Sequence, residues 1–380
     1  MRVLIAPQEF KGSLTAVAAA RAMAEGVRRA DTEVGVDLAP LSDGGPGFLD
    51  AMLDATDGTR LRVMARDPLG RSVEAAIGLI DAGRTAIIES AEATGIKRLR
   101  QDEFAPRYAT TSGVGDLILA ALDAGAERLI VGLGGSATND GGAGMAQALG
   151  VRLLDGCGVD LPPGGAALRA LAAIDATGID PRLAAVDLLM ASDVRNPLCG
   201  PDGASAVFGP QKGADAAAVR DLDAALKHYA VRVSLDLGID VGSTPGAGAA
   251  GGLGAGLIAF LDARVQSGFD LVSQTIGLET RIGAADLVLT GEGRLDGQTG
   301  FGKTVAGVAR LGHAAEVPVV ALCGGLAPGW RSLLTEGLTA AFSVVPAPMT
   351  LDDAHRDASE LVTAAAEQVI RLTATFASRT

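Results

Sequence analysis

The chain has 380 residues, of which 48% are hydrophobic and only 3% aromatic, so its core must consist mainly of Ala, Val, Leu and Ile. The length predicts two domains, at roughly 150 residues per domain. The net charge of −13 argues against nucleic acid and anionic membrane surfaces as main partners. Three scattered cysteines show neither disulfide nor metal-binding spacing, and we therefore expect a soluble, cytoplasmic protein.

The chain begins with an alternation of strand-like and helix-like segments, which is typical of α/β architecture. Residues 2–6 predict a strand, followed by the loop PQEFKGS and a helix from about Ala16 to Arg29 that Thr15 caps. A second strand is expected at residues 33–39. The Gly-rich stretch SDGGPG then leads into a helix near Phe48 to Ala55.

The region from residue 60 to residue 90 has a different pattern. Three consecutive strands with turns leave no room for helices, which indicates a mixed sheet and a change of domain. The α/β alternation returns after Thr111, and a long helix is expected at about Ala216 to Leu237. We predict that both chain ends, 1–62 and 284–380, form one α/β domain with a parallel sheet. Residues 63–283 would form an inserted α/β domain.

Lysine is rare in this chain, with five Lys against 27 Arg, and three of the five stand beside Gly in expected loops. They are Lys11, Lys212 and Lys303. A Lys ammonium is a compact charge on a flexible stem, which suits a phosphate group in a loop. These lysines are therefore candidate phosphate-binding residues, the alternative being solvated turn residues.

Four aspartates lie at strand ends or in Gly-rich loops: Asp43, Asp140, Asp193 and Asp296. Ligands of open α/β sheets bind at the carboxyl ends of strands. Phosphoryl transfer needs carboxylates that hold Mg²⁺ and one that orients or deprotonates the attacking hydroxyl. Together with the loop lysines, these acids favour a phosphate and metal site over simple Asx turns.

The stretch GLGGSATNDGG allows more than one interpretation. Gly132, Gly134 and Ala137 fit a dinucleotide-binding pattern, with Asp155 expected at the end of the next strand. The helix of that motif would have to run through residues 139–142, where two glycines disfavour it. The letters are also similar to the phosphate loop of galactokinase and homoserine kinase relatives. We favour a nest of backbone N–H groups that binds phosphate.

Residues 297–304, GQTGFGKT, fit the P-loop pattern G-x-x-x-x-G-K-[ST]. A P-loop requires a strand that runs directly into the first glycine. The expected strand ends at Thr290, and six residues separate it from Gly297, so we predict that this segment is not a P-loop.

Six long motifs in order give the chain a family resemblance: IAPQEFKGSLTA, SDGGPG, GLGGSATNDGGAGM, SDVRNPLCGPDGASAVFGPQKGA, GAGAAGGLGAGL and GEGRLDGQTGFGK. Together they resemble bacterial glycerate kinases of the two-domain, non-P-loop type, nearly end to end. The resemblance implies ATP-dependent phosphorylation of D-glycerate, usually at the 2-hydroxyl, with Mg²⁺. It also implies a three-layer α/β domain built from both chain ends, an inserted α/β domain, a site between them, and a monomer or homodimer.

The resemblance also suggests a role for each candidate. Lys11 and Lys303 would neutralise phosphate charge, and Asp193 or Asp296 would be the catalytic base. Glycerate would be bound by Arg294, Ser13 and Asn196. The nucleotide phosphates would be bound by Gly134, Gly135, Ser136, Asn139, Asp140 and Lys212. Asp43 or Glu292 would hold Mg²⁺. The chain departs from the family pattern at Gln8, Glu9 and Pro46, and Thr304 stands where Ala is common.

Overall fold

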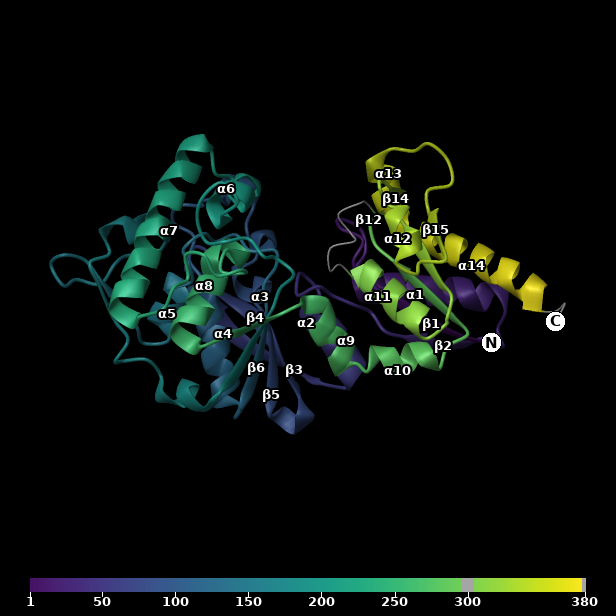
Figure 1. Ribbon diagram of the computed structural model, residues 1–380, viewed down its shortest axis with the longest axis horizontal. Helices are drawn as coiled ribbons and strands as arrows, with labels where there is room; N and C mark the ends of the chain where they lie inside the picture. Colours follow the sequence, from purple (N-terminus) through teal and green to yellow (C-terminus); the bar gives the residue numbers. More distant parts are fainter. Residues whose placement is uncertain (296–303, 378–380) are drawn as a thin grey trace. The chain divides into compact units, whose positions relative to one another are not determined.

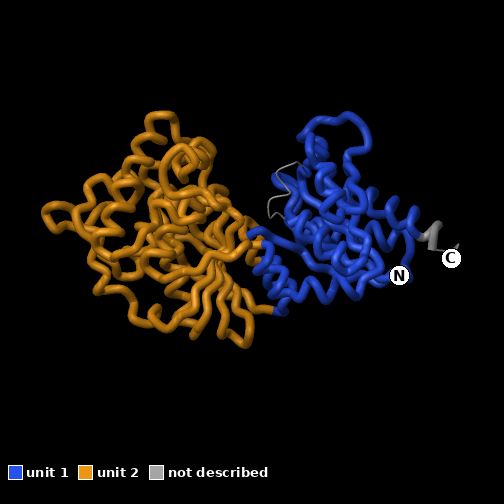
Figure 2. Tube along the Cα trace, in the orientation of Figure 1, with its two compact units in different colours: residues 1–43, 50–57, 269–380 blue, residues 44–49, 58–268 orange. Residues whose placement is uncertain are grey.

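The computed structural model describes residues 1–295 and 304–377, which divide into two compact units (Figures 1 and 2). Unit 1 comprises Met1–Asp43, Asp50–Asp57 and Phe269–Thr380, and unit 2 comprises Gly44–Leu49 and Gly58–Gly268. The domain boundaries expected at residues 62 and 284 remain a prediction. The compact units differ from them mainly by placing residues 269–283 with the chain ends.

Unit 1 is built on a sheet of five parallel strands in the order β15-β13-β11-β1-β2. The strands are β1 (Arg2–Pro7), β2 (Gly35–Leu38), β11 (Leu287–Gly291), β13 (Val319–Cys323) and β15 (Ala340–Ser343). Val3 pairs with Leu287 on one side and with Val36 on the other, so the N-terminal strand lies inside the sheet. A two-stranded ribbon, β12 (Arg294–Leu295) and β14 (Gly325–Leu326), follows β11 and β13.

Helices cover both faces of this sheet, which gives unit 1 three layers. The helices α1 (Ala16–Ala30) and α14 (Ala358–Ala377) pack together and share a core with alternate strand residues such as Ile5 and Leu289 (Figure 1). The helix α11 (Thr304–Ala314) contacts β11 and β13. Shorter helices are α9 (Gly268–Thr275), α10 (Leu278–Gly283), α12 (Ser332–Thr335) and α13 (Leu351–Arg356).

The predicted start of α1 is confirmed, because the Thr15 side chain accepts a hydrogen bond from the Ala18 N–H at 3.1 Å. Its packing on α14 depends on Gly26. A Cβ at that position would lie 2.1 Å from the Thr363 carbonyl oxygen, so only glycine allows this close approach.

Unit 2 contains a six-stranded mixed sheet in the order β10-β9-β6-β5-β4-β3. The strands are β3 (Thr59–Arg66), β4 (Ser72–Ile80), β5 (Thr85–Glu89), β6 (Arg128–Gly132), β9 (Asp187–Ala191) and β10 (Arg264–Gln266). The first three are antiparallel neighbours, and the remaining pairs are parallel. This confirms the mixed sheet expected from residues 60–90. A separate antiparallel pair is formed by β7 (Arg152–Leu154) and β8 (Ala173–Asp175).

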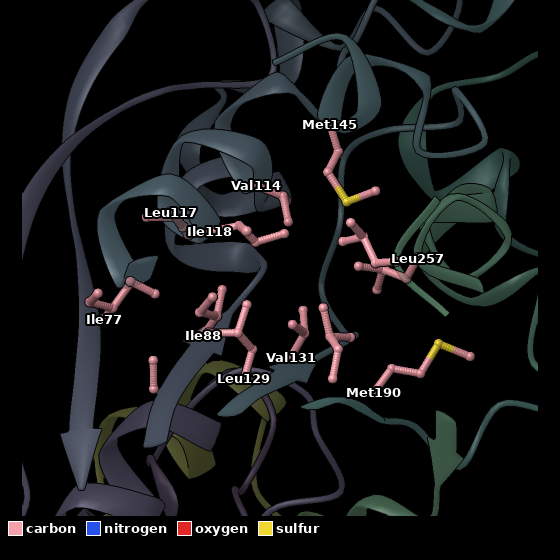
Figure 3. Packing of buried hydrophobic residues seen from close by; sticks show 14 of the residues in the cluster. Ile77, Ile88, Val114, Leu117, Ile118, Leu129, Val131, Met145, Met190 and Leu257 are labelled. Carbon is pink, nitrogen blue, oxygen red and sulfur yellow. The ribbon is translucent and has the colours of Figure 1, made fainter. Parts of the chain in front are cut away.

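The core of unit 2 forms where an apolar helix face meets this sheet. The helix α4 (Ser112–Asp123) carries Val114, Leu117, Ile118 and Ala121 at helical spacing, and all four are fully buried (Figure 3). The other helices are α3 (Ala91–Thr94), α5 (Ala143–Ala148), α6 (Ala204–Phe208), α7 (Ala216–Leu237) and α8 (Ala249–Leu261). The helix α2 (Phe48–Thr56) begins in unit 2 and ends in unit 1. Among the helices that the structure describes, none has the length and apolar character needed to cross a membrane.

Candidate active site

The carboxyl ends of the parallel strands of unit 1 open onto a cavity of about 600 Å³. The loops after β1, β11, β13 and β15 all contribute to its lining. The strands β1 and β11 are neighbours at the point where the strand order reverses, with β2 to one side and β13 and β15 to the other. Open α/β sheets bind their ligands at such a switch point.

Glycines bring the loops around this cavity into close contact. A Cβ at Gly293 would lie 3.1 Å from the Lys11 backbone nitrogen, and one at Gly324 would lie 2.5 Å from the Gly293 carbonyl oxygen. Gly12 has a φ of +83°, and its backbone packs on the His355 imidazole. The backbones therefore approach closely enough for the side chains at these strand ends to share one cavity.

One part of the cavity is strongly charged. It is lined by five of the residues predicted from the sequence: Lys11, Ser13, Asp43, Glu292 and Arg294. Lys11 and Arg294 are exposed, and neither forms an ion pair within residues 1–295 and 304–377. The Ser13 hydroxyl donates to the Phe10 carbonyl at 3.0 Å, which holds the Lys11–Gly12 turn in place. This part of the cavity offers two cations to an anionic ligand.

Another part of the cavity lining is apolar. Val344 and Val345 follow β15, and Leu351 and Leu361 come from α13 and α14. His355 of α13 lies in the same lining. Sequence reasoning missed this wall, because these residues look like ordinary core and helix positions until the fold assembles them.

In unit 2, the second group of predicted residues lies in the loop between β6 and α5 and next to it. Lys212 is 3% exposed, and its ammonium donates to the Ser136 hydroxyl at 2.8 Å and to the Thr138 carbonyl at 2.6 Å. Burial lowers the pKa of Lys212 to about 7, and the nearby charge of Asp140 opposes this shift. Lys212 is therefore hydrogen-bonded to the loop between β6 and α5 from the interior of unit 2.

Asp140 and Asn139 also support this loop from within, and both are fully buried. The Asp140 carboxylate accepts from the backbone and hydroxyl of Thr111, at 2.8 and 2.9 Å, and from the N–H groups of Gly142 and Gly144. Burial raises the pKa of Asp140, whereas these hydrogen bonds oppose the shift. Asn139 donates to the Ser205 hydroxyl at 2.8 Å. The loop is thus tied to the start of α4 and to α6.

Gly134 and Gly135, the predicted phosphate nest, pack against the SDGGPG segment. A Cβ at Gly134 would lie 2.4 Å from the Gly45 Cα, and one at Gly135 would lie 2.8 Å from the Pro46 ring. Glu89, at the end of β5, accepts from the N–H groups of Gly47 and Leu49 at 3.1 Å each. The departure at Pro46 therefore lies directly beside the glycine loop.

The structure contradicts the dinucleotide-binding interpretation of this loop. The motif requires a helix that begins directly after Gly132 and Gly134. Here α5 begins only at Ala143, and Gly141 and Gly142 before it have φ values of +67° and +79°. The next strand, β7, belongs to a separate antiparallel pair and ends before Asp155. The Asp155 carboxylate instead accepts from the Cys157 and Val159 N–H groups in a turn.

The remaining predicted residues fall in other places. Asp193 follows β9, and its Oδ1 accepts from the Gly268 N–H at 3.0 Å. Asn196 donates to the Asp202 carbonyl within its own loop at 2.8 Å. Asp296 and Lys303 lie outside the described residues. The predicted candidates therefore form one group in unit 1 and another in unit 2.

In the sequence, the residues that match the P-loop pattern, 297–304, are separated from β11 by a further strand. The strand β11 ends at Gly291, and β12 follows at Arg294–Leu295 before the motif begins at residue 297. The helix α11 begins at Thr304, which is fully buried. Its hydroxyl has no hydrogen-bond partner among the residues that the structure describes. This local topology differs from that of a P-loop, in which the strand leads directly into the glycine loop.

Comparison with known proteins shows the class of this chain, which is an enzyme that transfers a phosphoryl group to an alcohol. Residues 3–374 match the model of the Glycerate kinase family, and the chain belongs to that family.

Relatives match over nearly the whole chain. A glycerate kinase from Halalkalibacterium halodurans is 47% identical, with 97% of each chain covered. A glycerate 2-kinase from Escherichia coli K12 is 42% identical, also with 97% of each chain covered. A crystal structure from Salmonella typhimurium LT2, assigned as a glycerate kinase 2, is 44% identical. It superposes with a TM-score of 0.85 and covers 99% of this chain and 98% of that one.

Proposed function

We propose that this glycerate kinase uses ATP and Mg²⁺ to phosphorylate D-glycerate at its 2-hydroxyl. The observation that carries the proposal is the cavity of unit 1, at the switch point of a parallel sheet. Two cations, which form no ion pair with any described residue, and two carboxylates meet there. The name of the Escherichia coli relative, glycerate 2-kinase, supports the choice of the 2-hydroxyl.

The charged residues have separate roles in this proposal. Lys11 neutralises charge on the transferred phosphoryl group, and Arg294 pairs with the carboxylate of glycerate. Lys303, outside the described residues, would add a further positive charge for the phosphoryl group. The glycine loop of unit 2, with Lys212 beneath it, would bind phosphate through backbone N–H groups.

The residues present fit a magnesium ion. The described part of the chain contains no group of three or more His, Cys, Asp or Glu that could hold a metal alone. Mg²⁺ is commonly bound by one or two carboxylates together with substrate phosphates, and Asp43 and Glu292 can supply those carboxylates. When bound, the ion would neutralise phosphate charge. The base that takes the hydroxyl proton would be Asp193 or Asp296.

A coupled assay tests this function. The purified protein is given ATP, Mg²⁺ and D-glycerate, and ADP release is followed with L-glycerate as the control acid. A second assay adds an enzyme that dehydrates 2-phosphoglycerate but not 3-phosphoglycerate. We expect ADP release with D-glycerate and dehydration of the product without further enzymes. A product that resists dehydration would overturn the choice of the 2-hydroxyl.

A further inference from the structure

We propose that the cavity of unit 1 is the nucleotide site, with the nucleobase of ATP on its apolar wall and the phosphates in its charged part. This inference rests on the proposed function, since it assigns one of the two substrates of that reaction to a particular cavity. It concerns unit 1 alone.

The size of the cavity argues for the larger substrate. Its volume of about 600 Å³ lies within the range of roughly 300–1,000 Å³ that is usual for sites of drug-sized ligands. A three-carbon acid would fill only a small part of this space, whereas a nucleoside triphosphate would fill much more of it.

The apolar wall argues for a ligand that has an apolar surface of its own. Val344, Val345, Leu351 and Leu361 line this side, and Leu351 is 69% exposed although it is a large hydrophobic residue. Every carbon of glycerate carries an oxygen, so the acid would gain little from this wall. A flat nucleobase gains about 25 cal/mol for each Å² of apolar surface that it buries. The imidazole of His355 adds a hydrogen-bonding group beside the wall for a ring nitrogen or a ribose hydroxyl.

The charged part of the lining has groups that a triphosphate and its metal require. Lys11 follows β1 at the switch point and can pair with the phosphates, whereas Arg294, which follows β11, pairs with the carboxylate of glycerate. Both cations are exposed and form no ion pair with any described residue. Asp43 and Glu292 line the same part and can share Mg²⁺ with the phosphates. A ligand that combines an apolar ring with anionic groups therefore matches both parts of the lining.

A substitution on the apolar wall tests this assignment. Ala354 lies half-buried on α13 and lines the cavity, so Ala354→Phe should fill the space of the nucleobase. We expect isothermal calorimetry with Mg²⁺ and ADP to show binding at least tenfold weaker than in the parent protein. The KM for ATP should rise at least tenfold, while the KM for D-glycerate stays within twofold. The matched control is Ala224→Phe on the exposed side of α7 in unit 2, which should change none of these values.

A second variant covers the case in which Ala354→Phe does not fold. Leu351→Glu changes an exposed side chain of the same wall and adds a negative charge, so it should also weaken ADP binding without loss of circular dichroism.

The possible outcomes separate the two proposals. If the folded variants bind ADP like the parent, or if only the KM for D-glycerate rises, the cavity is not the nucleotide site, although the kinase reaction stands. If the parent protein binds ADP and the variants do not, but no D-glycerate is phosphorylated, the nucleotide site stands and the proposed reaction fails.

Discussion

Lys212, predicted from the sequence to bind phosphate, lies beneath the glycine loop of unit 2 and is buried. The prediction was made because Lys212 stands beside glycine in a chain that otherwise favours arginine. The structure places its ammonium under that loop, where it is bonded to Ser136 and Thr138. The burial of Lys212 depends on how the short 3-10 helix η6 (Pro210–Lys212) packs within unit 2. No local sequence pattern around Lys212 predicts this packing.

The lowered pKa of Lys212 predicts a pH dependence of stability. Its pKa falls from 10.5 to about 7 on folding, so between these values the unfolded chain binds more protons than the folded one. The contribution of this group to the free energy of unfolding therefore rises with pH from about 7 to about 10. Urea unfolding of the parent and of Lys212→Met should show that the parent gains stability relative to the variant over this range. A difference that stays constant with pH would mean that the amine is not desolvated.

Thr304 separates the P-loop interpretation from ours. In a P-loop its hydroxyl would hold Mg²⁺ and be indispensable. Here the hydroxyl is buried without a hydrogen-bond partner among the described residues, so Thr304→Ala should keep kcat within about threefold of the parent, under about 0.7 kcal/mol. Steady-state kinetics will check this, and a combined loss of activity and Mg²⁺ affinity would establish a P-loop after all. Lys303→Ala, the companion variant, should lower kcat by roughly 100-fold, about 3 kcal/mol.

At the scale of the elements, unit 1 is held together where α1 from the beginning of the chain meets α14 from its end. The two helices bury Val27, Val362 and Ile370 in one core with the sheet. The ion pair of Arg29 with Glu360, at 2.7 Å, crosses the exposed edge of this contact and adds at most about 1 kcal/mol. The contact at Gly26 sets how close the two backbones come.

Gly26→Ala should therefore destabilise unit 1, although alanine favours helices by about 1 kcal/mol. The new methyl group would meet the Thr363 carbonyl, and the resulting overpacking should cost about 1–3 kcal/mol. Gly283→Ala is the matched control, since it lies in helix α10 with no atom within 4 Å of its Cβ. Chemical denaturation should show a lower midpoint for Gly26→Ala only. Equal midpoints for the two variants would refute the close packing of α1 on α14.

The bounds of helices could be predicted from the sequence where local interactions determine them. Thr15 caps α1, and α7 spans Ala216–Leu237 as its pattern indicates, because capping and helical periodicity are local properties. The beginning of α8 was not predictable. Ala250 and Gly251 have left-handed backbones, and a Cβ at Gly251 would lie 1.9 Å from the Thr138 carbonyl, which is a tertiary contact.

At the scale of the whole molecule, the charged residues of the unit 1 cavity were predictable from the sequence, whereas its apolar wall was not. Lys11, Asp43, Glu292 and Arg294 do line one cavity, because all of them follow strands of one parallel sheet. The apolar wall beside them depends on where α13 and α14 fold back, so no motif around Leu351 or Leu361 indicated it. The three cysteines are free, as Cys157, Cys199 and Cys323 form no disulfide in the structure.

The proposed chemistry makes turnover dependent on a divalent cation. We expect EDTA to abolish ADP release in the D-glycerate assay and excess Mg²⁺ to restore it, because the charge on the transferring phosphoryl group must be neutralised. Circular dichroism recorded in EDTA serves as the control that the fold persists. Full activity in the chelator would exclude the metal role of Asp43 and Glu292.

The position of β1 inside the sheet, between β2 and β11, has a consequence for the order in which the protein is made. Its neighbour β11 lies 284 positions further along, as the pairing of Val3 with Leu287 shows. During translation β1 cannot pair with β11 until just over three quarters of the polypeptide has been made, whereas residues 58–268 of unit 2 are already complete. The middle of the chain can therefore fold first. Until β11 emerges, the nascent N-terminal segment exposes apolar residues of β1 and α1. We therefore expect chaperones to bind this segment during synthesis.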